Sequence, residues 1–128
     1  MEAGEPIPEL RVTPDKYVTY RYAGASGDFN PIHIDEEFAR AVGLPGRILH
    51  GLWTMAQVAR AAEQLAGDDP TALRRLSVQF RGMGALEQEI VVTGTVREVA
   101  DGTATLDLEA EQAGKRIIRN GEADIAVS

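Results

Sequence analysis

The segment GLWTMAQVARAAEQLA, residues 51–66, is followed by a long series in which apolar and polar residues alternate, and together they determine the predicted architecture. Apolar side chains recur in the segment at spacings of three and four, which is the period of an α-helix. These positions are Leu52, Met55, Val58 or Ala59, Ala62 and Leu65. The alanines make the helix slim, so it can lie close to a sheet. Gly67-Asp68-Asp69-Pro70 ends it.

From Leu73 onward the apolar residues recur at every second position, which is typical of half-buried β-strands. The predicted strands centre on residues 76–80, 90–96, 104–110 and 117–127. Tight turns are predicted at Asp101-Gly102 and Gly114-Lys115, and Asn120-Gly121 predicts a bulge or a close packing point. Since one apolar helix must cover the apolar face of these strands, the sequence predicts an α+β domain.

The first half of the chain predicts shorter elements. Prolines suit an edge strand, and an acidic residue or a Thr-Pro pair suits the start of a helix. The expected elements are an edge strand over 6–12, a helix over 14–23 capped by Thr13, an irregular loop over 24–31, and a helix over 36–42 capped by Asp35 and stopped by Gly43.

The composition excludes several classes of protein. A chain of 128 residues, 44% hydrophobic and 26% charged, predicts a single domain over 1–128 with a substantial core. The absence of cysteine excludes disulfides and thiolate ligands, and with two histidines we expect no metal site. A net charge of −7 argues against a nucleic-acid partner.

The sequence also argues against a membrane partner. No apolar run approaches the roughly 18–20 residues that cross a bilayer. Residues 1–10 lack the basic start and apolar core of a signal peptide, so we expect a cytoplasmic location.

The residues suited to chemistry lie in ASGDFNPIH, residues 25–33, and in LHG, residues 49–51. A glycine and an Asn-Pro pair prevent one regular helix, so the backbone turns between Asp28 and His33 and can bring them to one point. Gly51 opens the predicted central helix, whose first N–H groups can bind an anionic oxygen. An acid–base pair beside such a site suits chemistry next to a carbonyl.

The run from Tyr22 to His33, followed by residues 49–51, resembles the MaoC-like hydratases and dehydratases. Within that group the chain is most similar to short actinobacterial 3-hydroxyacyl-carrier-protein dehydratase subunits of fatty acid metabolism. The resemblance implies one hot-dog domain, a curved antiparallel sheet wrapped around a central helix. It also implies edge-to-edge dimerisation, with an identical or a related chain.

The resemblance further implies a reaction. The expected activity is (R)-specific hydration of trans-2-enoyl thioesters, or the reverse dehydration of (R)-3-hydroxyacyl thioesters, on coenzyme A or acyl carrier protein and without a cofactor. Asp28 is expected to deprotonate the water that adds to C3, His33 to relay the proton, and the Gly51 N–H to bind the thioester carbonyl. The residues expected to contact the substrate or to brace its loop are Asn30, Phe29, Trp53 and Met55.

Other interpretations stay open at this stage. Asp28 and Asn30 also suit a simple turn, the apolar substrate-binding candidates also suit a core, and His50 is expected to be structural. Several central arginines could meet the phosphates of coenzyme A or an acidic carrier protein, or they could be solvated surface charges. They are Arg40, Arg47, Arg60, Arg74, Arg75 and Arg81.

Two departures from the family pattern and two rival functions remain. A serine that some members carry along the central helix is absent at Val58-Ala59-Arg60, and the segment after Phe80-Arg81 lacks the usual proline. These differences bear on the pocket rim and on chain-length preference. The rival functions are a hot-dog acyl-thioesterase, and an acyl-binding subunit of a heterodimeric dehydratase.

Overall fold

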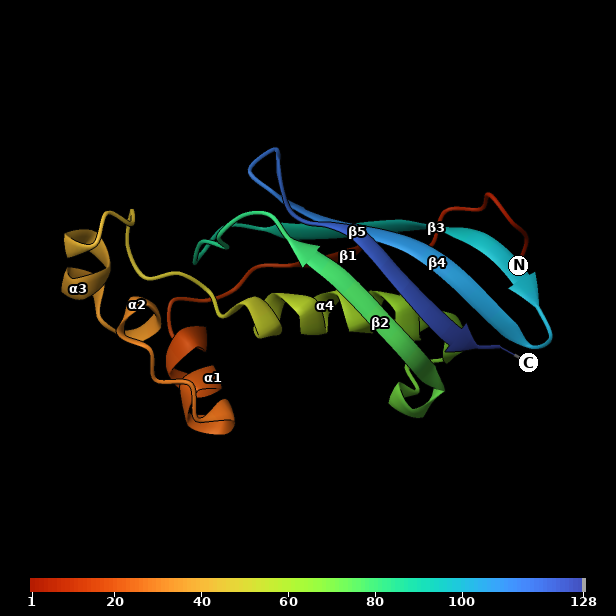
Figure 1. The fold of residues 1–128 in the computed structure, drawn as a ribbon, viewed down its shortest axis with the longest axis horizontal. Helices are drawn as coiled ribbons and strands as arrows, with labels where there is room; N and C mark the ends of the chain where they lie inside the picture. The colour runs from red at the N-terminus through yellow and green to blue at the C-terminus, as the bar shows by residue number, and fades with distance from the viewer. Residues whose placement is uncertain (128) are drawn as a thin grey trace.

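A computed structural model describes residues 1–127; residue 128 of the predicted single domain lies outside this range. The elements are β1 (Leu10–Val12), α1 (Val18–Ser26), α2 (Pro31–Ile34), α3 (Glu36–Ala41), α4 (Gly51–Glu63), η1 (Gln64–Ala66), η2 (Pro70–Ala72), β2 (Leu73–Phe80), β3 (Ile90–Ala100), β4 (Thr103–Gln112) and β5 (Lys115–Ala126). The strands form one curved antiparallel sheet in the order β1-β3-β4-β5-β2, and α4 lies along one of its faces (Figure 1). The predicted α+β architecture is therefore confirmed.

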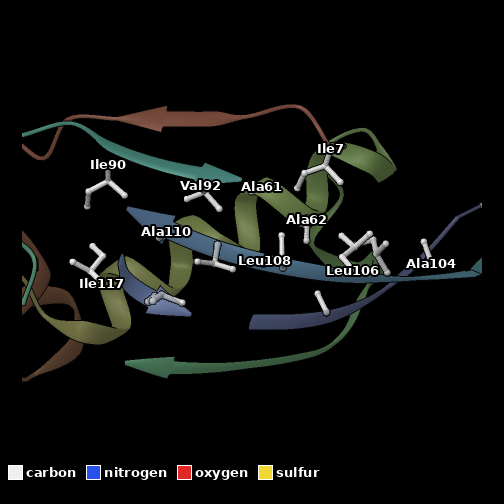
Figure 2. Packing of buried hydrophobic residues seen from close by; sticks show 14 of the residues in the cluster. Ile7, Ala61, Ala62, Ile90, Val92, Ala104, Leu106, Leu108, Ala110 and Ile117 are labelled. Carbon is white, nitrogen blue, oxygen red and sulfur yellow. The ribbon is translucent and has the colours of Figure 1, made fainter. Parts of the chain in front are cut away.

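The core lies between α4 and the sheet. Figure 2 shows side chains of β3 and β4, such as Val92 and Leu106, together with the alanines of α4. Ala61 and Ala62 are fully buried, and their small side chains let the helix approach the strands closely. Each large apolar side chain buried here contributes about 1.5–3 kcal/mol relative to exposure.

The face that α4 turns toward the sheet departs from the predicted stripe in its first turns. Val58 and Ala62 are buried as expected, but Leu52 is 61% exposed, and Thr54 and Gln57 are buried instead. These polar residues follow the same spacing of three and four, so periodicity alone did not choose between the two stripes. Gln57 can be buried because its amide donates to the Trp53 carbonyl and its oxygen accepts from Arg60.

The strand connections follow the sequence closely. Asp101-Gly102 forms the β3–β4 turn, with φ values of 53° and 76°. The β4–β5 turn falls at Ala113-Gly114, one residue earlier than predicted. Leu108 of β4 pairs with Gly121 of β5, and Ala110 pairs with Ile118. Two positions along β4 therefore correspond to three positions along β5, so β5 contains one extra residue. This extra residue, with Asn120 at φ 50°, is the predicted bulge.

Three predictions about the first half are corrected. The edge strand is reduced to β1, with a single bridge from Pro6 to Thr95. The first helix is α1, which starts at residue 18, because Asp15 rather than Thr13 binds the free N–H of Tyr17 at 2.7 Å. The irregular loop is limited to residues 27–30, because α1 runs to Ser26 and α2 begins at Pro31.

Helices α1, α2 and α3 lie together beyond the first turn of α4, at the end of the molecule opposite the termini (Figure 1). α3 begins as predicted, with the Asp35 side chain accepting the N–H of Phe38. Arg47 links this group, since its guanidinium binds Glu36 at 3.2 Å and the Thr19 hydroxyl at 2.9 Å. No helix within residues 1–127 combines the length and the apolar character needed to cross a membrane.

Candidate active site

The turn between α1 and α2 positions Asp28, the predicted catalytic carboxylate. Gly27 ends α1 in the left-handed conformation at φ 79°, which glycine adopts without strain. The Asp28 carboxylate then accepts the N–H of Asn30 at 3.2 Å. Asn30 in turn caps α2 by accepting the N–H of Ile32 at 3.3 Å. These local bonds turn the chain sharply and start the helix that carries His33.

His33 faces Asp28 with its free nitrogen. Its Nδ1 lies 2.8 Å from the carbonyl oxygen of Ile48. A carbonyl only accepts hydrogen bonds, so the neutral ring carries its hydrogen on Nδ1 and leaves Nε2 bare. Nε2 lies 3.9 Å from Asp28 Oδ2. That distance is too long for a direct hydrogen bond and matches two bonds of about 2.8 Å to one shared water.

His50 and Gly51 bring the start of α4 to the same place. His50 Nε2 lies 3.0 Å from the main-chain oxygen of Asp28, and its ring stacks on that of His33. Gly51 is the first residue of α4. Within residues 1–127 its N–H has no hydrogen-bond acceptor. A side chain at Gly51 would place its Cβ 3.2 Å from the Phe80 ring, so glycine keeps this N–H approachable.

A cavity of about 180 Å³, here called the catalytic cavity, opens beside these residues. Its walls include His33, Gly51, Thr54, Phe80 and Met83. Thr54 is a buried polar residue that was not among the predicted site residues. The signal was its spacing, because a residue three positions after Gly51 faces the same side of a helix.

The substrate-binding candidates are placed differently. Asn30 caps α2, Phe29 is 58% exposed, and Met55 is half-buried without lining the catalytic cavity. Trp53 lines a second cavity, of about 450 Å³, beside Tyr22. The structure thus places His33 and Gly51 in the wall of the catalytic cavity and Asp28 beside His33. Asp28 and the apolar candidates are not among the residues that line this cavity.

Two of these residues, Asp28 and His33, also lie close enough to His50 for the three to hold a cation. Asp28, His33 and His50 each offer one ligand atom, and these atoms lie within 4.8 Å of one another. One nitrogen of each imidazole, however, already faces a main-chain carbonyl. These bonds set the tautomers of both rings, which suits proton transfer at Nε2 of His33.

Comparisons with known proteins identify the family. A family model described as "MaoC like domain" matches residues 2–119. The chain is 37% identical over 107 residues to the fatty acid synthase beta subunit TOXC of Cochliobolus carbonum, covering 81% of this chain and 5% of that protein. It is 41% identical over 73 residues to the peroxisomal enoyl-CoA hydratase 2 of Arabidopsis thaliana, covering 56% and 23%. The chain belongs to the MaoC-like domain family.

Solved structures show the same fold. A MaoC-like dehydratase superposes with a TM-score of 0.91 and 29% identity, over 100% of this chain and 41% of that one. A chain of the ChsH1–ChsH2 complex from Mycobacterium tuberculosis superposes with a TM-score of 0.86 and 20% identity, over 98% of both chains. The hot-dog fold expected from the resemblance is confirmed.

Proposed function

We propose that this domain catalyses reversible (R)-specific hydration of trans-2-enoyl thioesters carried by coenzyme A or acyl carrier protein. The main support is the approach of Asp28 and His33 to 3.9 Å beside the unpaired N–H of Gly51. The names of the similar hydratase and dehydratase support the same reaction class. The chain spans only 5% and 23% of the length of the two curated relatives, so the activities of those proteins are extended to this chain only as part of the proposal.

Asp28 and His33 would act on one water molecule. The carboxylate of Asp28 and the bare Nε2 of His33 are both hydrogen-bond acceptors, so each can accept a hydrogen bond from one of the two hydrogens of the water. As the water oxygen bonds to C3, Asp28 takes one of its protons, and that proton passes by way of Nε2 of His33 to C2. The other hydrogen stays on the new C3 hydroxyl group, and both side chains return to their starting protonation states. The water is thereby added completely, and dehydration follows the same steps in reverse. Well-placed acid–base groups contribute about 10²–10⁴-fold in rate.

Gly51 would supply the electrophilic assistance. As water adds to C3, negative charge moves through C2 to the thioester oxygen. The N–H of Gly51, at the positive end of α4, is suited to bind that oxygen. The neighbouring Phe80 ring leaves space for a flat thioester but not for a branched side chain at residue 51.

A second hot-dog subunit, identical or related, would complete the site. The Asp28 side chain is 51% exposed in the single chain, although acid–base chemistry benefits from exclusion of water. Phe80 and Met83, which line the catalytic cavity, are also about half exposed. β2 is an edge strand with a free side for pairing.

The predicted cytoplasmic location stays a prediction.

The reaction is tested with a trans-2-enoyl-CoA and the purified protein, by following loss of the enoyl absorbance, configuration of the product and release of free thiol. Formation of the (R)-3-hydroxyacyl thioester supports the proposal. Release of thiol without hydration would instead indicate the thioesterase. If neither reaction occurs with CoA or carrier-protein substrates, with or without a related subunit, the acyl-binding role is favoured.

Sedimentation should give a mass about twice that of the 13.8 kDa chain.

A further inference from the structure

We propose that His50 is a positioning residue that holds both members of the catalytic pair in place. It binds the main chain at Asp28 and stacks on the ring of His33. This role rests on the proposed function and adds a residue to it. The sequence alone indicates only a structural role for His50.

The first contact fixes the loop that carries Asp28. His50 Nε2 lies 3.0 Å from the Asp28 carbonyl, so Nε2 carries the hydrogen and donates it. The other bonds that set this loop, from the Asp28 N–H to Ser26 and from the Asn30 N–H to Asp28, stay within the loop and the end of α1. The bond from His50 instead ties Asp28 to the start of α4, where Gly51 lies.

The second contact fixes the plane of the His33 ring. The two imidazole rings lie 3.9 Å apart between centroids and only 22° from parallel. Tyr22 packs against the His50 ring at 4.7 Å and 53°. The bond from His33 Nδ1 to Ile48 fixes one end of the His33 ring, and the stack restricts its rotation. Nε2 therefore stays directed toward Asp28.

An unpaired nitrogen argues against a purely space-filling role. His50 is 2% exposed, and its Nδ1 has no hydrogen-bond partner within residues 1–127. A buried acceptor without a partner destabilises the folded state, and a phenylalanine of similar size would avoid this. A histidine at this position is explained if the protein needs the donor on its opposite nitrogen.

The tautomers give a test that does not depend on activity. His33 and His50 are the two histidines of the chain, so a ¹H–¹⁵N spectrum of the imidazoles contains only these rings. At neutral pH we expect His33 to be protonated on Nδ1 and His50 on Nε2. Protonation of His50 on Nδ1 or on both nitrogens would overturn the proposal, whatever reaction the protein catalyses.

Two substitutions separate the contacts. His50→Phe keeps a ring to stack on His33 and removes the donor, whereas His50→Gln offers an amide donor and removes the ring. Each should lower kcat about tenfold or more while KM changes less than about twofold, because the pair is displaced rather than the substrate site. The His33 ¹⁵N signals should keep the Nδ1–H form in His50→Phe. In His50→Gln the unstacked His33 ring is free to rotate away from the Ile48 carbonyl, so its signals should average between tautomers.

A double-substitution cycle and a control complete the test. In an Asp28→Asn background, His50→Phe should lower the residual rate less than about twofold, because the carboxylate that it positions is gone. Val92→Ala, in the core strand β3 and outside the catalytic cavity, should reduce stability and leave kcat unchanged. Additive losses in the cycle, or an equal kcat loss in Val92→Ala, would overturn the proposal. A wild-type protein without hydratase activity would contradict the proposed function, while the two tautomers would still decide the role of His50.

Discussion

At the residue scale, the site depends on short-range bonds that the sequence encodes directly. Asn30 shows this most clearly, because its side chain caps the four-residue helix α2 that carries His33. A helix this short has little stability of its own, so its start must be fixed by a cap. Asn30 therefore braces the loop by capping α2.

Asn30→Ala should lower the free energy of unfolding by about 1 kcal/mol and also reduce hydratase activity, because the start of α2 loses its cap. Asn30→Asp, which keeps an acceptor, should recover most of both losses. Asp69→Ala is a matched control, since Asp69 caps η2 by accepting from Thr71. Urea titration and initial rates measure the two effects. Equal activity in Asn30→Ala and Asp69→Ala would contradict the expectation.

At the scale of elements, the start of α4 begins the core helix and, in the proposed mechanism, also supplies the N–H that binds the thioester oxygen. Gly51 is suited to both, and proline offers a selective test. Proline is favourable at the first position of a helix and has no N–H. The preceding residue, His50, has φ −65° and ψ 133°, which is compatible with a following proline.

Gly51→Ala and Gly51→Pro both add a Cβ beside Phe80, but only the proline removes the N–H. We expect kcat for Gly51→Pro to fall a further 10²–10³-fold, roughly the effect of removing an oxyanion donor. Thermal unfolding should show similar stability for the two variants. Equal rates in a folded Gly51→Ala and Gly51→Pro would show that the N–H has no role in catalysis.

The same elements show what the sequence could predict. Alternation along β2 to β5, the turn at Asp101-Gly102 and the bulge at Asn120 follow from local chemistry and were predicted. The spacing of Asp28 and His33 also predicted their meeting. The buried face of α4 was not predicted, because two equally periodic stripes of this helix could meet the sheet. The contacts of His50 were not predicted either, because they join segments that lie far apart in the chain, such as Asp28 and His50, 22 residues apart.

At the scale of the whole molecule, a network of ion pairs lies across the strands. Arg75 binds Asp124 at 2.9 Å, and Arg97 binds Glu122 at 2.6 Å. Hydrogen bonds from Arg97 and Arg75 hold the pKa of Glu122 below its ordinary value of 4.5. The bond from Arg75 likewise lowers the pKa of Asp124 below 3.8. These carboxylates bind protons less readily in the folded state.

Stability from this network is therefore complete above the ordinary carboxyl values and is lost as pH falls through the lowered ones. Urea titrations at pH 6 and at about pH 3 should show that Arg75→Gln destabilises the protein more at the higher pH. The difference should also shrink in high salt, since these side chains are partly exposed to solvent. An Arg75→Gln effect of equal size at both pH values would exclude this contribution.

The most direct test of the central claim is the rate of hydration of a trans-2-enoyl-CoA by wild type, Asp28→Asn and His33→Gln. Both substitutions keep the size of the side chain and remove its capacity to exchange protons. We expect wild-type hydration, and a loss of about 10²-fold or more in each variant with the fold retained by circular dichroism. Activity that survives in both variants would contradict the assignment of Asp28 and His33 as the catalytic pair.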